Sequence, residues 1–144
     1  MTLAELITRV EQGSGSDGEL DAAICEALQY VHGCPTAKNV KALEKAWFGT
    51  QIEFERDCEN SFREKWLSPP LTSSLDAVRA LLKARLDEPW FQVIEDEHPN
   101  NRNPCAVFVS FKAEGFNFIE AAHHDIHRAF LSATLKAIAA KEGG

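Results

Sequence analysis

The sequence lacks several short motifs by which enzymes are commonly identified. It contains no G-x-S-x-G nucleophile elbow, no Walker phosphate loop and no H-E-x-x-H zinc motif. Serine hydrolysis, phosphate-loop nucleotide binding and zincin-type hydrolysis therefore have no direct support from motifs. Function has to be inferred from composition, from helix and strand patterns, and from local clusters of polar or aromatic side chains.

Paired cysteines and long apolar runs are also missing. The four cysteines, at positions 25, 34, 58 and 105, form no C-x-x-C pair. No apolar run approaches the ~20 residues that cross a bilayer, and the opening MTLAELITRV lacks the basic and apolar regions of a secretory signal. We therefore expect reduced thiols, a cytoplasmic location and no membrane partner.

Basic residues are outnumbered by acidic ones. The chain has 15 lysines and arginines against 22 aspartates and glutamates, which gives a formal net charge of −7. Such a surface repels a phosphate backbone unless the bases gather on one face, so duplex nucleic acid is not an expected partner. With 144 residues and a hydrophobic fraction of 44%, the chain is expected to form a single domain over residues 1–144.

Three stretches combine a helix-capping residue with apolar residues at helical spacing. They are residues 2–10, 17–31 and 73–86, capped by Thr2, by Asp17 and by Ser73 or Ser74. The stretch from Gly13 to Gly18, GSGSDG, is interpreted as a flexible turn between the first two helices.

The segment 36–66 carries mixed signals. Thr36 can cap a helix that reaches Trp47, whereas after residue 51 a strand-like alternation gives way to apolar residues at every fourth position. We predict that this segment is a helical insertion into the domain.

Two later stretches are rich in the β-branched and aromatic residues that strands favour. They are WFQVI at 90–94 and CAVFVSF at 105–111, and they predict an antiparallel pair. Apolar residues occupy both faces of the second strand, which favours helices on both sides of the sheet. Residues 120–141 predict a helix buried over much of its circumference. The expected fold is α+β: an α-β-α sandwich with a small antiparallel sheet covered by helices.

The order of these pieces resembles a known family. ELDAAICEAL at 19–28, PPLTSSLDAVRALL at 69–82, the Trp-led strand pair and AFLSATLKAIAA at 129–140 resemble the phage ABA sandwich family of small bacteriophage and prophage proteins. The resemblance extends over all of the chain except about residues 32–68. It implies a single α-β-α unit and brings no catalytic residues with it. This chain departs from the family pattern in the segment 36–66 and in a histidine-rich stretch near residue 123.

The histidine-rich stretch EAAHHDIHRAF, residues 120–130, is the sharpest candidate for a chemical site. On a helix, His123, His124 and His127 would share a face within reach of one metal ion. Glu120 would add a carboxylate in the E-x-x-H spacing that carboxylate-bridged metals use in helix bundles. This arrangement would support a metal-dependent hydrolase.

A structural interpretation uses the same residues without a metal. A zinc site needs at least three protein ligands, so one from outside the stretch would have to lie close; the candidates are His32, Cys34 and His98. If the helix begins near Ala122 or His123, as the resemblance implies, Asp125 complements the positive end of the helix dipole. The histidines then need no ion, and we favour this interpretation, with no cofactor required.

Aromatic residues gather in the segment that departs from the family pattern. They are Trp47, Phe48, Phe54, Phe62 and Trp66, and they are interleaved with acidic residues. Either they pack the insertion onto the core, or they form an aromatic and acidic contact surface for a protein partner.

From the resemblance, together with the acidic charge and the compactness of the chain, we predict a phage or prophage accessory protein that binds a bacterial host protein, with antagonism of an antiviral defence as its role. The alternative is a protein that sequesters a nucleotide ligand, with Arg102 in the strand loop and Arg128 on the last helix as phosphate ligands. A metal-dependent hydrolase ranks below both. Self-association is a further expectation, because a small sheet leaves its edges open.

Overall fold

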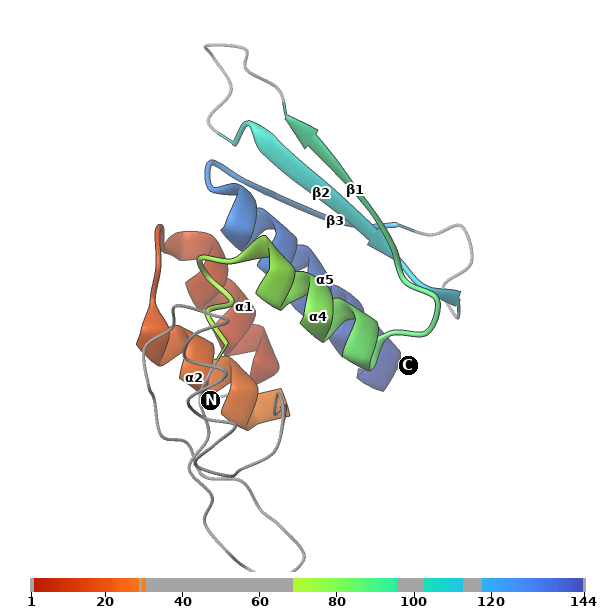
Figure 1. Cartoon of the computed structure of the whole chain (residues 1–144), viewed down its shortest axis with the longest axis horizontal. Coiled ribbons are helices and arrows are strands. Elements are labelled where there is room, and N and C mark those ends of the chain that lie inside the picture. The colour runs from red at the N-terminus through yellow and green to blue at the C-terminus, as the bar shows by residue number, and fades with distance from the viewer. Residues whose placement is uncertain (1, 29, 31–68, 96–102, 113–117, 144) are drawn as a thin grey trace, which may run out of the picture.

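A three-stranded antiparallel sheet and four helices make up the described part of the chain (Figure 1). The computed structural model describes residues 2–28, 30, 69–95, 103–112 and 118–143. The helices are α1 (Leu3–Gln12), α2 (Gly18–Leu28), α4 (Leu75–Arg85) and α5 (Ile126–Gly143). The strands are β1 (Trp90–Glu95), β2 (Cys105–Ser110) and β3 (Ile119–His123).

The predicted caps begin the first three of these helices. The Thr2 hydroxyl accepts a hydrogen bond from the Glu5 backbone N–H at 3.2 Å, and the Glu5 carboxylate accepts one from the Thr2 N–H at 3.0 Å. Asp17 accepts from the Leu20 N–H at 3.1 Å, and the hydroxyl of Ser74 accepts from the third residue of α4. Because each side chain satisfies a backbone donor that the helix leaves open, these helix starts are fixed by local sequence.

The sheet has the order β1-β2-β3, with β2 in the centre and both neighbours antiparallel to it. Phe91 lies opposite Val109 on β1, and Ile119 lies opposite it on β3. This inner face, which includes the buried Val107 and Val109, packs against the helices. The predicted antiparallel pair is therefore confirmed, and it gains a third strand.

The third strand corrects the predicted start of the last helix. Residues 120–123 were expected to be helical, but they pair with β2 and the helix begins only at Ile126. Within β3, Ala121 and His123 are buried while Glu120 and Ala122 are exposed, which is the period-two pattern of a strand. Alanine favours helices, but here the tertiary pairing with β2 outweighs that intrinsic preference.

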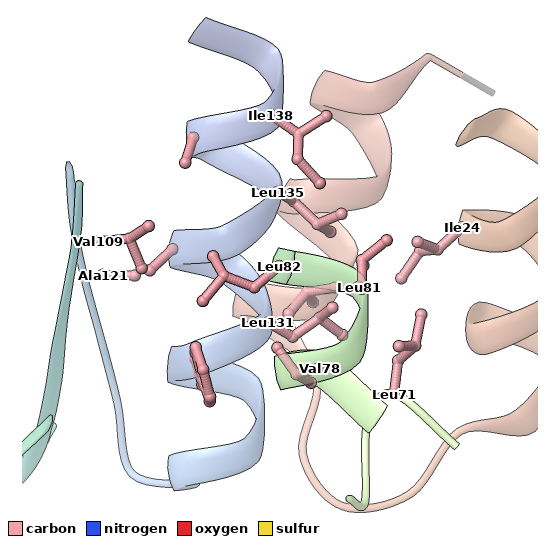
Figure 2. Close-up of a cluster of buried hydrophobic side chains, with 14 of the residues drawn as sticks. Ile24, Leu71, Val78, Leu81, Leu82, Val109, Ala121, Leu131, Leu135 and Ile138 are labelled. Atoms are coloured by element: carbon pink, nitrogen blue, oxygen red, sulfur yellow. The ribbon is translucent and has the colours of Figure 1, made fainter. Parts of the chain in front are cut away.

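Helix α5 lies between the sheet and the remaining helices (Figure 2). Val109 and Ala121 point from the sheet toward α5, whereas Leu131 and Leu135 point away from the sheet toward α1 and α4. Helix α2 packs on α1, outside that layer. Fully buried side chains run through all these layers; the largest are Leu6, Leu20, Ile24, Leu71, Leu81, Leu82, Leu131, Leu135 and Ile138.

The α+β prediction, with helices packing on a small antiparallel sheet, is confirmed. Within the described ranges all four helices lie on one side of the sheet, so the second helical layer that was expected is not among them (Figure 1). The predicted insertion at 36–66 falls outside the described residues. No helix in the described ranges has both the length and the apolar character needed to span a bilayer.

A buried acid fastens α2 to the turn that precedes α4. The carboxylate of Asp21, which is 2% exposed, accepts the Thr72 N–H at 2.9 Å. The Thr72 hydroxyl in turn accepts the Asp17 N–H at 2.8 Å. Burial raises the pKa of Asp21 to about 7, even though the hydrogen bonds from Thr72 favour the ionised form.

The raised pKa of Asp21 predicts a stability that falls with rising pH. Between about 4 and about 7, the folded chain holds a proton on Asp21 that the unfolded chain has lost, so the stabilisation present below this window disappears across it. Asp21→Asn keeps an acceptor for Thr72 but does not ionise. Urea unfolding across this window should therefore show the wild type losing stability relative to the variant. Parallel curves for the two proteins would show that Asp21 does not titrate in this way.

Candidate functional site

The histidine-rich stretch is divided between β3, a turn and α5. His123 is the last residue of β3 and is 5% exposed, His124 is exposed in the turn, and His127 lies in the first turn of α5. The prediction that the three histidines share one helix face is therefore wrong. Its physical cause is the change from strand to helix within the stretch, which rotates these side chains out of the predicted alignment.

His123 uses both of its ring nitrogens inside the protein. Its Nε2 lies 2.9 Å from the Gly13 carbonyl oxygen, and its Nδ1 accepts the Asp125 backbone N–H at 2.9 Å. Since Nδ1 accepts, the neutral tautomer that fits carries its proton on Nε2 and donates it to Gly13. This ring has no lone pair left for a metal ion.

Asp125 is the cap of α5. Its Oδ1 accepts the His127 N–H at 3.0 Å and lies 3.1 Å from His127 Nδ1, while its Oδ2 accepts the Gly15 N–H at 3.2 Å. Burial alone would raise the pKa of Asp125, but the hydrogen bonds from His127 and Gly15 lower it below the usual value. The structural interpretation of the stretch, in which Asp125 serves the helix start, agrees with this geometry.

The proposed metal ligands do not converge. Glu120 and His123 lie three residues apart on a strand, so their side chains project to opposite faces of the sheet. In the part of the chain that the structure describes, no group of three or more His, Cys, Asp or Glu side chains is placed to hold a metal ion. The outside ligands considered for this site, His32, Cys34 and His98, fall outside that part.

Arg128 lies inside the protein and is 2% exposed. Its Nε and Nη2 donate to the Gly15 carbonyl oxygen at 3.1 and 2.9 Å, and Nη2 also donates to Ser14. Its Nη1 donates to the carbonyl oxygens of Arg9 and Val10 at 3.3 and 3.2 Å. The guanidinium thus neutralises the carbonyl end of α1 and the following turn, and it does not point toward solvent, where a phosphate ligand would bind.

The turn whose carbonyl oxygens Arg128 binds also matches a short glycine motif, and here that motif has a structural role. Gly13, Gly15 and Gly18 match G-x-G-x-x-G, but a helix rather than a strand precedes them, unlike in dinucleotide-binding loops. Asp17 already occupies the start of α2, where a pyrophosphate would sit. A Cβ on Gly13 would lie 2.5 Å from Arg128 Nη1, so this glycine admits the guanidinium.

An open groove of about 600 Å³ runs beside β3. One wall consists of the consecutive residues 120–124, and the other contains Glu11, Gln12 and Lys136; Asn103, which precedes β2, also lines the groove. The Glu11 carboxylate forms an ion pair with Lys136 and accepts the Ser132 hydroxyl at 2.8 Å. Burial would raise the pKa of Glu11, but these two partners lower it, so the opposite wall carries a fixed ion pair.

The outer face of the sheet exposes large apolar side chains. Trp90, Ile94 and Phe118 are 48%, 44% and 53% exposed, and the rings of Trp90 and Phe118 lie 5.2 Å apart. Phe108, half-buried on β2, belongs to the same face and lies opposite Gln92 on β1 and Glu120 on β3. We call these four residues the outer patch. The sequence indicates this patch only indirectly, because apolar residues occupy both faces of the second strand. That pattern predicted a second layer of helices rather than an exposed apolar surface.

The remaining binding residues predicted from the sequence cannot be compared with this arrangement. Trp47, Phe48, Phe54, Trp66 and Arg102 fall outside the described residues. The contact surface expected in the segment 36–66 therefore stays a prediction.

Comparisons with known proteins identify no relative. No family model matches the chain, and neither curated proteins nor solved structures give a match. The resemblance to the phage ABA sandwich family consequently rests on the sequence segments that carry it.

Arg128→Met is predicted to destabilise the fold strongly. The substitution leaves buried carbonyl oxygens of α1 and the turn without donors, at a cost on the order of 3 kcal/mol. Lys136→Met is the matched control on the same helix, because it removes a cation that forms only a surface ion pair with Glu11 and should cost at most about 1 kcal/mol. Chemical denaturation measures both. Similar losses in the two variants would refute the structural role of Arg128.

Proposed function

We propose that the chain is a phage or prophage accessory protein that binds a host protein through the outer patch. Antagonism of a host antiviral defence is the role we assign to this binding. The observation that carries the proposal is the exposure of Trp90, Ile94 and Phe118 on one face of a regular sheet. Large exposed apolar side chains on one face are characteristic of protein interaction sites, and tryptophan is enriched among the residues that dominate binding energy.

The geometry of the outer patch supports a preformed contact surface. Its residues lie on or next to strands whose register is fixed by pairing along β2, so their spacing does not depend on a partner. The Trp90 and Phe118 rings also support each other across the sheet. A rigid aromatic surface loses little conformational entropy when it binds.

Charge indicates the chemistry of the partner. Exposed Glu95 lies at the end of β1, and exposed Glu120 lies on the outer side of β3. Together with the net charge of −7, they favour a partner that presents basic side chains around an apolar centre. Two copies of the chain would bring like charges together, so a second copy is the less favoured occupant of this surface.

The nucleotide alternative has less support from the described residues. Arg128 is committed to backbone carbonyls, and the groove beside β3 pairs its lysine with Glu11 and adds the carboxylate of Glu120. These carboxylates disfavour a phosphate group. The hydrolase alternative lacks a converging set of ligands in the same part of the chain.

Capture of a stoichiometric host protein by the tagged chain, followed by titration of the purified pair, tests this proposal. Trp90→Ser and Phe118→Ser should each weaken the complex by about 30-fold or more, because truncating a central aromatic anchor costs at least about 2 kcal/mol. Leu75→Ser is the matched control, since Leu75 is 37% exposed but lies on α4.

Circular dichroism should show that all three variants remain folded. The proposal fails if no stoichiometric partner is captured, or if the outer-patch variants bind as tightly as Leu75→Ser.

A further inference from the structure

We propose that the groove beside β3 binds an extended, basic peptide segment, which adds to the sheet as a further strand. This inference rests on the proposed function and specifies how a part of the partner is recognised. Strand addition supplies affinity through main-chain hydrogen bonds, and side-chain pockets supply specificity. Four features of the molecule support such binding: the open edge of β3, the opposite wall of the groove, its charge and its continuity with the outer patch.

The first observation is the position of β3. The sheet order β1-β2-β3 places it at an edge, and among the described residues no strand pairs with its other side. Backbone N–H and C=O groups on such an edge form a template for an incoming strand. The groove follows this edge, because five consecutive residues, 120–124, form one of its walls.

The second observation is that the opposite wall is held in place. Ser132 and Lys136 of α5 fix the Glu11 carboxylate on α1, and the His123 ring is anchored to the Gly13 carbonyl oxygen beneath the groove. A volume of about 600 Å³ lies within the ordinary range of binding clefts. A five-residue strand is roughly 17 Å long, so the groove suits a short extended segment rather than a folded domain.

The third observation is the charge of the groove. Its lysine, Lys136, is paired with Glu11, which leaves Glu120 as a carboxylate without an ion pair there among the described residues. A lysine or arginine of the incoming segment would supply the missing partner. The His124 ring lies against the His123 ring with centroids 4.2 Å apart, and both residues line the same groove as Glu120.

The fourth observation is continuity with the outer patch. Glu120 and Ala122 line the groove and are also exposed on the outer side of β3. A partner seated over Trp90 and Phe118 would therefore extend an arm around the β3 edge without leaving the surface. The outer patch and the groove form two parts of one interface, and substitutions can disrupt each part separately.

Selection from a displayed library of random octapeptides on the full-length chain tests the groove. The recovered peptides should contain lysine or arginine, and in NMR titrations of the labelled chain they should shift the amides of residues 120–124 and Gln12. Methylation of alternate peptide nitrogens should weaken binding by at least about tenfold, since it removes the main-chain donors that strand addition needs.

Glu120→Lys should also weaken binding by about tenfold or more, whereas Glu19→Lys should not. Glu19 is an exposed acid on α2, so this control changes the net charge by the same amount away from the groove. The inference is overturned if no peptide is recovered, if recovered peptides shift residues elsewhere, or if both charge reversals have the same effect.

Peptide binding in the groove can be tested separately from host-protein binding through the outer patch. Trp90→Ser should leave peptide binding unchanged, because Trp90 lies on β1, at the opposite edge of the sheet. Peptide binding with no host partner would refute the proposed function alone. A host partner whose affinity does not respond to Glu120→Lys, together with absent peptide binding, would refute the groove alone.

Discussion

The guanidinium of Arg128 donates hydrogen bonds to four backbone carbonyls, at the end of α1 and in the turn that follows it. Next to it, His123 and Asp125 hold the same turn through Gly13 and Gly15. The transition from β3 to α5 is thereby fastened to the first helix of the chain. Because α5 packs directly on the sheet, this contact also sets the position of the β3 edge and of the groove beside it.

This constraint explains why His123 and His127 do not share the helix face that the sequence predicts. The side chains of His123 and Asp125 form hydrogen bonds with backbone groups. At the start of α5, both the backbone N–H and the Nδ1 of His127 contact the Asp125 carboxylate. Among the described residues, the parts of the sheet that no helix covers are the outer patch and the β3 edge. A one-sided arrangement of helices, all on the inner face among the described residues, leaves an apolar sheet face available for binding.

The sequence predicted the features that depend on neighbouring residues. The caps at Thr2 and Ser74 and the pairing of β1 with β2 follow from local signals, and each is present in the structure. The third strand could not be predicted, because its alanines favour a helix. Its strand conformation depends on hydrogen bonding to β2, which is a tertiary contact. The structural role of Arg128, which donates hydrogen bonds to backbone carbonyl oxygens, could not be predicted from the sequence. Its acceptors lie more than 100 residues away in the chain, and no local pattern encodes such a contact.

The central claim is that the chain functions by binding through the outer side and the β3 edge of its sheet. Hydrogen–deuterium exchange of the chain, alone and in complex with the captured host protein, measures this most directly. The account predicts that the added protection falls on β1, on β3 and on the turn at His124, while α2 and α4 exchange as in the free chain. Protection confined to α2 and α4, with the sheet unchanged, would contradict it.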